Sequence, residues 1–486
     1  MSRPCLSGAA SGILEVNTSL RSRLIRIFDY GLILGPLLIL SIVGALGGWW
    51  YLAASYDMVI SGGRVIDPET GMDRVMYIGI NNGKITALSE YPLFGQIEIP
   101  AKGKIVGPGF IDVSAHSIRK FDQQMALLSG VTTVLDNSVG TDNMTGLKFE
   151  VGRPYVNFGS GVNAAGLKPS AVLQPVQFSN WISRIETQLK SGGGAIIWNV
   201  PPDLAGFESE LMPLVSVAIK YKVPLAVQFP VVRSGGQLTA EVQRLIDVAQ
   251  SASINIILQD LLPDSHIFNR AVLAQLTHAN DPQIWYTFSP YSGEILDSKS
   301  TPYSIGDLRS AQVPIFDFDS GERIRMNRRR WPATVIAMVT PMSVLNEAVL
   351  DPQSLVASDS QLDFSGRLHP RYTGTFARIL RKWVVGSGKL SWVDAFRLMS
   401  ERPAGLFSRT YPQLKSKGKI SVGADADIVI IDPKMIEDWG TYQHPVQPSR
   451  GVIHVIVNGR WVVKKRQFMG KVRPGEFLIP ANPPDK

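Results

Sequence analysis

The residues best suited to chemistry stand at the end of the stretch 107–116, which reads GPGFIDVSAH. His116 closes this stretch, and Ser114 lies two residues before it. Residues two apart on a β-strand point to the same face, so both side chains would face one pocket. An imidazole is a good zinc ligand, whereas a serine hydroxyl is a poor one. The pair therefore predicts either one weak metal ligand or a hydrogen-bonded pocket histidine.

Cysteine offers no replacement ligand near this stretch. The only cysteine among the 486 residues is Cys5, so the body of the chain can form neither a disulfide nor a thiolate metal site. The formal net charge of +8 is spread over a large surface. Such a modest excess gives no reason to expect nucleic-acid binding, and it is compatible with an anionic membrane nearby.

The elements that would position these residues alternate between strand and helix. Short apolar stretches are followed by stretches with a helical apolar stripe, a pattern typical of a buried parallel sheet. About 300 residues of this kind fit a (β/α)8 TIM-like barrel over residues 108–410. The predicted strands are 195–200, 224–229, 255–259 and 284–288, and the predicted helices are 207–221, 238–252 and 268–278.

The two ends of the body are rich in short strands. Asn-Gly pairs at 82–83 and 458–459 predict tight hairpin turns, because both central residues of such turns need positive φ. Residues 55–107 and 418–486 therefore predict one composite β-sandwich built from both chain ends. The fold class is α/β.

Residues 31–54 form an apolar segment without a charge. As a helix with a rise of about 1.5 Å per residue it would be about 36 Å long, enough to cross a hydrocarbon core of about 30 Å. The leader 1–30 carries four arginines, and Asp57 is the first charge after the segment. We expect a single-pass signal anchor, a cytoplasmic N-terminus and a body on the exported (periplasmic or extracellular) side. The alternative is a cleaved signal peptide, with small residues at 45–47 as its cleavage site.

Several motifs occur in an order that is specific as a set. The motifs are 58–68 (MVISGGRVIDP), 106–112 (VGPGFID), 130–134 (GVTTV), 357–360 (ASDS), 369–376 (HPRYTGTF) and 422–429 (VGADADIV). By these motifs, the body from about Asp57 to Ile479 resembles the N-acyl-D-amino-acid deacylase (D-aminoacylase) type of the amidohydrolase superfamily.

The resemblance implies hydrolysis of a non-peptide C–N bond, the amide of an N-acyl amino acid, with zinc as the family's metal. One or two ions activate water and polarise the carbonyl, and an aspartate after the last barrel strand transfers the proton. Asp359 stands at that catalytic position. Its alternative role is to stabilise the mouth of the barrel.

The other family positions are substituted here. By the resemblance, Ser114, Ser138, Gln228 and Gln259 stand at lost ligand positions, so His116 remains as a weak metal ligand, with Asp136 nearby. Asn163 stands where relatives carry histidine. Neutral amides and hydroxyls bind zinc poorly, which predicts weak zinc binding or none.

A polar pocket would still remain without the metal. We expect Arg371, His369, Gln228, Gln259 and Asn163 to contact the substrate, with Arg371 binding a carboxylate through its two-pronged guanidinium. A structural ion pair is the alternative for Arg371.

The sequence therefore predicts a membrane-anchored amidohydrolase-type protein that acts on a small N-acyl amino acid through a degraded metal site. The alternative is a catalytically inactive pseudoenzyme that serves as a binding or scaffold protein. No nucleic-acid partner is expected, and the inactive alternative leaves room for a protein partner.

Overall fold

The computed structural model describes most of the body of the chain. The described residues are 39–42, 56–116, 118–169, 175–229, 235–259, 269–279, 281–297, 313–324, 332–359 and 368–481.

An all-parallel, eight-stranded sheet forms a nearly closed barrel, which confirms the predicted TIM-like core. Its strand order is β16-β12-β11-β10-β9-β8-β7-β6. A side chain links the two edge strands, β6 and β16. Asp112 ends β6, and its Oδ1 accepts the backbone N–H of Ser358, two residues after β16, over 3.1 Å. The strands are β6 (Phe110–Asp112), β7 (Val131–Thr141), β8 (Asn157–Asn163), β9 (Ile196–Asn199), β10 (Leu225–Gln228), β11 (Ile256–Gln259), β12 (Ile284–Phe288) and β16 (Ser354–Val356).

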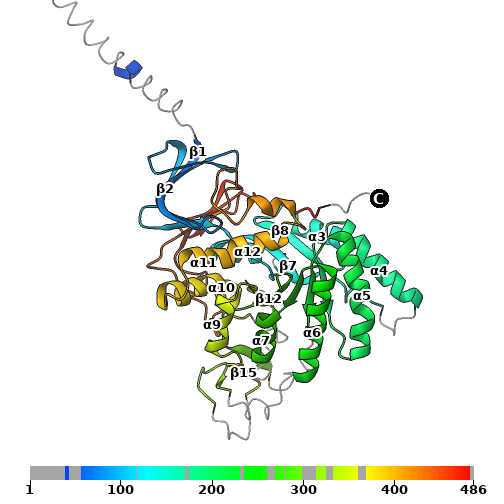
Figure 1. Cartoon of the computed structure of the whole chain (residues 1–486). Helices are drawn as coiled ribbons and strands as arrows, with labels where there is room; N and C mark the ends of the chain where they lie inside the picture. The colour runs from blue at the N-terminus through cyan, green and yellow to red at the C-terminus, as the bar shows by residue number, and fades with distance from the viewer. Residues whose placement is uncertain are drawn as a thin grey trace, which may run out of the picture.

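Helices cover the outside of the barrel (Figure 1). The three helices predicted from apolar stripes are present as α5, α6 and α7, because each stripe packs against the sheet and leaves the polar face in water. The helices are α2 (Lys120–Leu128), α3 (Met144–Val151), α4 (Pro175–Lys190), α5 (Leu204–Tyr221), α6 (Gly235–Ala252), α7 (Asn269–Ala279), α9 (Met342–Leu350), α10 (Arg371–Ile379), α11 (Trp392–Phe396) and α12 (Arg402–Phe407). Two π-helical segments, η1 (Leu380–Gly386) and η2 (Arg397–Glu401), and the 3-10 helix η3 (Pro412–Ser416) complete them.

A small antiparallel sheet interrupts the barrel pattern between β12 and β16. It consists of β13 (Glu294–Asp297), β14 (Ile315–Asp317) and β15 (Thr334–Ala337) in the order β13-β15-β14. This sheet has an apolar core of its own, which includes Ile315 and Val335. The sequence pattern gave no indication of it.

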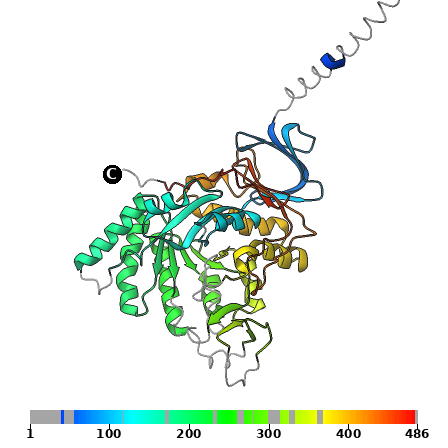
Figure 2. The same ribbon diagram turned by 180° about the vertical axis from the view of Figure 1, so that it is seen from behind.

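The two ends of the body share one nine-stranded sheet beside the barrel, seen as the blue and red strands in Figures 1 and 2. One apolar core joins residues of both ends, such as Ile60 and Ile428. The path β20-β19-β18-β17-β5-β1-β2-β3 is continuous, with β4 also paired to β1. The strands are β1 (Tyr56–Asp67), β2 (Met72–Asn81), β3 (Lys84–Ser89), β4 (Gly95–Pro100), β5 (Ile105–Pro108), β17 (Ile428–Ile431), β18 (Val452–Val457), β19 (Arg460–Lys464) and β20 (Gln467–Phe468).

Both predicted hairpin turns are present in this sheet. Asn82 and Gly83 have φ of 50° and 78°, and Asn458 and Gly459 have φ of 46° and 71°. The C-terminal tail after β20 pairs with the barrel instead of the nine-stranded sheet: Phe477 forms a parallel bridge with Phe158 of β8. Residues 476–478 thus contact the barrel, although the sequence assigned them to the sandwich.

The predicted membrane segment 31–54 lies outside the described residues except for 39–42, which are helical. Within the described part of the chain, no helix has the length and apolar character needed to cross a membrane.

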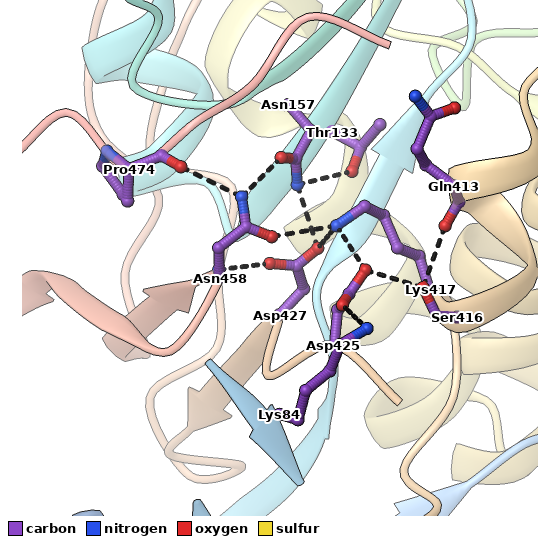
Figure 3. Close-up of polar contacts among 10 residues, drawn as sticks. All are labelled: Lys84, Thr133, Asn157, Gln413, Ser416, Lys417, Asp425, Asp427, Asn458 and Pro474. Atoms are coloured by element: carbon purple, nitrogen blue, oxygen red, sulfur yellow. Dashed lines mark hydrogen bonds and ion pairs between the residues drawn. The ribbon is translucent and has the colours of Figure 1, made fainter. Parts of the chain in front are cut away.

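A buried lysine joins the nine-stranded sheet to the barrel (Figure 3). The Lys417 ammonium lies 2.7 Å from Asp427 Oδ2 and 2.9 Å from Asp425 Oδ2, and it donates to Asn458 Oδ1 over 3.0 Å. Its side chain is only 5% exposed. Burial opposes the charge, but the two carboxylates outweigh it and raise the pKa of Lys417, so the group is an ammonium at neutral pH.

The same cluster reaches the start of barrel strand β8. Asn157 Nδ2 donates to Asp427 Oδ2 over 2.9 Å, and Asn458 Nδ2 donates to Asn157 Oδ1 over 2.8 Å. Asn458 Nδ2 also donates to the Pro474 carbonyl over 3.0 Å. One hairpin turn of the sheet is therefore fixed to the barrel and to the C-terminal tail.

Lys417→Met should lower the free energy of unfolding by about 3–5 kcal/mol, because it leaves the buried carboxylate of Asp427 without its cation, whereas Asp425 keeps Lys84. Lys419→Met is the matched control, since Lys419 pairs with Glu69 at the surface and such pairs contribute about 0–1 kcal/mol. Urea unfolding followed by circular dichroism measures both. Equal losses in the two variants would contradict the assignment of Lys417 as the junction.

Candidate active site

The centre of the site is a bulge in β7. Asp136 pairs with Ser160 and Thr141 pairs with Val162, so residues 137–140 leave the ladder. Asp136 Oδ1 holds the bulge by accepting backbone N–H groups of Val139 (3.2 Å) and Gly140 (3.0 Å). Gly140 has φ of 59°, and a Cβ there would lie 2.5 Å from the Gly161 carbonyl oxygen, so only glycine fits.

His116 forms a pair with the fixed carboxylate of Asp136. Its Nδ1 lies 2.8 Å from Asp136 Oδ2; the Asp136 side chain is fully buried and that of His116 is 31% exposed. Burial opposes a charge on His116, but the hydrogen bond and the charge of Asp136 outweigh it and raise the pKa of His116. Within the described residues Nε2 has no hydrogen-bond partner, so it is the nitrogen through which His116 can exchange a proton.

Two of the predicted neutral side chains hold the same bulge. Gln228, at the end of β10, donates from Nε2 to the Ser138 carbonyl over 2.6 Å. Asn163, at the end of β8, donates from Nδ2 to the Val139 carbonyl over 3.1 Å. The structure therefore brings together four residues that the sequence singled out: His116, Ser138, Asn163 and Gln228.

Unmet hydrogen-bonding capacity remains at three predicted ligand positions. Ser114 Oγ, Ser138 Oγ and Gln259 Nε2 are buried and have no partner within the part of the chain that the structure describes. Gln259 Oε1 accepts from Thr287 Oγ1 over 3.4 Å. Buried polar atoms are nearly always paired, so this set is suited to bind water or a polar ligand group.

Asp359 belongs to a second cluster at the end of the last barrel strand. Its backbone has a φ of 43°, a conformation that non-glycine residues rarely adopt. Arg371 Nη2 lies 2.7 Å from Asp359 Oδ2, and Arg371 Nη1 lies 2.9 Å and 3.1 Å from the two oxygens of Glu294. Arg371 thus forms the structural ion pair that the sequence left as an alternative.

His369 holds this cluster from behind. Its Nδ1 accepts the backbone N–H of Arg371 over 3.0 Å, and its Nε2 lies 2.8 Å from the Gly293 carbonyl. Burial and the nearby Arg371 charge lower the pKa of His369 well below its usual value, so the ring is neutral with the proton on Nε2. Both ring nitrogens of His369 thus have hydrogen-bond partners within the protein. The expected contact of His369 with the substrate stays a prediction, and this geometry does not support it.

Sequence reasoning missed two carboxylates of the site. Burial raises the pKa of Asp112 to about 6, and its Oδ1 accepts the backbone N–H groups of Ser114 (3.3 Å) and Ser358 (3.1 Å). Asp112 was visible in the GPGFID motif, as a carboxylate at the end of an apolar strand. No sequence motif indicated Glu294, because it is the first residue of β13 in the inserted sheet, which the sequence did not predict.

The donor set of the described residues does not fit a zinc ion. Within the described ranges, no group of three or more His, Cys, Asp or Glu side chains is placed to hold a metal. His116 and Asp136 bind each other, Arg371 binds both Asp359 and Glu294, and Asp112 accepts two backbone N–H groups. The other polar side chains described at these positions are neutral hydroxyls and amides. Zinc requires imidazole, thiolate or carboxylate groups that converge on one point.

Known proteins match this chain in both sequence and fold. The sequence profile described as "Amidohydrolase family" matches residues 357–463. An N-acyl-D-glutamate deacylase of Alcaligenes xylosoxydans xylosoxydans is 25% identical, with 87% of this chain and 96% of that protein covered. A D-aminoacylase of the same organism is 22% identical, with 86% and 96% covered.

A solved structure has the same fold. The N-acyl-D-glutamate deacylase of Bordetella bronchiseptica, crystallised with zinc and a phosphonate inhibitor, matches with a TM-score of 0.70 at 22% identity. The match covers 87% of this chain and 99% of that one. The barrel, the shared sheet and the ordered motifs thus agree with the comparisons: residues 357–463 match the amidohydrolase family, and the chain as a whole is similar to the N-acyl-D-amino-acid deacylases.

Proposed function

We propose that this protein hydrolyses the amide bond of a small N-acyl amino acid, and that the His116–Asp136 pair transfers the proton. The relatives that cover nearly the whole chain are an N-acyl-D-glutamate deacylase and a D-aminoacylase, which supports this substrate class. The observation that carries the proposal is the 2.8 Å hydrogen bond between His116 and the buried Asp136.

The geometry of this pair suits general base catalysis. Asp136 fixes the imidazole through Nδ1 and leaves Nε2 to take a proton from water. A histidine whose pKa lies near the working pH is an effective proton-transfer group. Asp359 is a weaker candidate for the base, because Arg371 already holds its carboxylate.

The second candidate function is binding of such a ligand without hydrolysis. The ion pair between Asp359 and Arg371 favours it, because it withdraws the carboxylate that the family uses for proton transfer. In that case the protein would bind N-acyl amino acids in calorimetry and release no free amino acid.

His116→Gln should lower kcat by about 100- to 10,000-fold, the usual contribution of a general base. His444→Gln, at an exposed loop position, is the matched control and should keep wild-type activity. Release of free amino acid from N-acetyl-D-glutamate and related N-acyl-D-amino acids measures the effect. Turnover that is equal in wild type and His116→Gln would refute the assigned base.

The pH profile should follow the raised pKa of His116. The rate should rise with pH as the imidazole loses its proton, with an apparent pKa above 6.5. Asp136→Asn removes the group that raises the pKa while burial still lowers it, so the acidic limb should move to lower pH. The Asn amide oxygen can keep the bonds to Val139 and Gly140, and its NH2 group then faces His116 Nδ1. The neutral imidazole would then carry its proton on Nε2, so the rate should fall as well. A limb that stays in place in Asp136→Asn would argue against the pair.

Removal of metal should leave this activity unchanged, because the described donors do not converge on one ion. Dialysis against a chelator, followed by the same assay and by metal analysis, makes the test. One zinc per chain, together with loss of activity on chelation and recovery with zinc, would show that a metal site exists.

We also propose that residues 31–54 anchor the protein in the membrane, with the N-terminus in the cytoplasm. The uncharged segment and the arginines before it support this proposal. The only cysteine, Cys5, reports the topology.

A membrane-impermeant maleimide should label Cys5 only after cells are permeabilised, and the full-length chain should resist carbonate extraction. Labelling of intact cells would place the N-terminus outside. A shortened chain that never reacts would instead show that the segment is a cleaved signal peptide.

A further inference from the structure

The last hairpin of the nine-stranded sheet carries an unusual density of positive charge. Between residues 460 and 475 the sequence contains no acidic residue. All of its basic side chains are exposed, as are Met469 (41%) and Val472 (37%). We call this segment the basic hairpin; its cations are Arg460, Lys464, Lys465, Arg466, Lys471 and Arg473.

The cations of the basic hairpin have no acidic partners within the described residues. Lys464 lies over the Trp461 ring at 4.5 Å, and Arg473 lies over the Tyr155 ring at 4.8 Å. Neither contact neutralises the charge. Glu476 follows the hairpin in the sequence, and Glu437 lies 3.9 Å from Arg450. Among the described residues, the hairpin therefore presents unpaired cations to solvent.

The turn of the basic hairpin is conformationally strained. Lys465 and Arg466 have φ of 49° and 67°, a region that favours glycine and asparagine. The other two tight turns of the sheet use Asn-Gly at these positions. Hydrogen bonds to β18 hold the strained turn, from Lys465 N–H to His454 Nδ1 (3.1 Å) and from Arg466 N–H to the Ile453 carbonyl (2.9 Å). Strain that a structure retains is a reason to look for a function of the side chains.

A surface groove of about 430 Å³ lies beside this turn. Lys465, Arg466 and Arg450 line it, together with Trp439, which is 43% exposed. Three guanidinium or ammonium groups around an exposed indole suit a phosphate that sits at an interface between water and an apolar phase.

We propose that the basic hairpin docks onto an anionic phospholipid surface, with a lipid phosphate in the groove. Exposed apolar side chains among the cations favour a bilayer over a nucleic acid, because they gain by entering the lipid interface. The sheet that carries the basic hairpin also contains β1, which begins at Tyr56, two residues after the segment 31–54 that is proposed as the anchor. An anchored chain would therefore hold this sheet close to the membrane. The docking site does not include His116, Asp136 or the other residues of the candidate active site.

The test uses the full chain with Cys5→Ser and Gln467→Cys, labelled at the single introduced thiol with an environment-sensitive fluorophore. It is reconstituted into vesicles of phosphatidylcholine, with or without phosphatidylglycerol. The emission should shift to the blue only with phosphatidylglycerol. Raising the salt to about 1 M, where the Debye length is about 3 Å, should reverse the shift.

Lys465→Asn with Arg466→Gly removes two charges and supplies the favoured turn pair, so the hairpin should fold at least as well. Each cation near an anionic surface contributes about 1 kcal/mol, or about fivefold, so the ratio of docked to undocked protein should fall about 25-fold. Arg381→Glu with Lys389→Glu changes two exposed basic residues outside the hairpin and should leave the shift intact.

Equal emission in both vesicle types, or an unchanged shift in the Asn-Gly variant, would overturn the proposal. A larger shift with a DNA or RNA oligonucleotide in phosphatidylcholine vesicles would assign the surface to nucleic acid instead. The same shift with soluble glycerol phosphate would assign the groove to a free phosphate ester. None of these outcomes depends on hydrolytic activity.

Discussion

The buried ammonium of Lys417 joins structures from three distant parts of the chain. It neutralises Asp425 and Asp427 where the shared sheet meets the barrel, and Asn157 extends the cluster to the first residue of β8. A buried charge is stable only while all its partners stay in place. This cluster therefore links the position of the sheet to the position of β8.

The candidate active site depends on that constraint through β8 and its neighbour β7. The Lys417 cluster holds the start of β8, whereas Asn163 at its end binds the bulge of β7. The bulge aims Asp136 at His116, and Gln228 binds it from β10. Hydrogen bonds from amides to carbonyl oxygens thus organise this end of the barrel.

Two clusters divide the polar groups of the barrel mouth. One is His116 with Asp136, where a buried carboxylate keeps an imidazole basic and leaves one nitrogen available. The other is Asp359 with Arg371 and Glu294, in which the charges satisfy each other. Asp112 ties the first strand of the barrel to the residues after the last, and its raised pKa reflects how completely this seam excludes water. Proton transfer is therefore better supported at the first cluster than at the second.

Sequence alone determined most of the barrel strands and helices that it predicted and both Asn-Gly turns, because strand and helix periods and turn residues are local properties. The helix with the stripe around Val242 and Leu245 and the two turns with positive φ are examples. The sequence also picked out His116, Asp136, Gln228 and Asn163 as site residues, but it did not predict the inserted sheet β13-β15-β14. Tertiary structure alone decided what these residues contact. Glu294 reaches Arg371 from an inserted sheet, and Gln228 binds a carbonyl of a bulge 90 residues away. Such contacts depend on where distant backbone segments pack, and no local spacing encodes that.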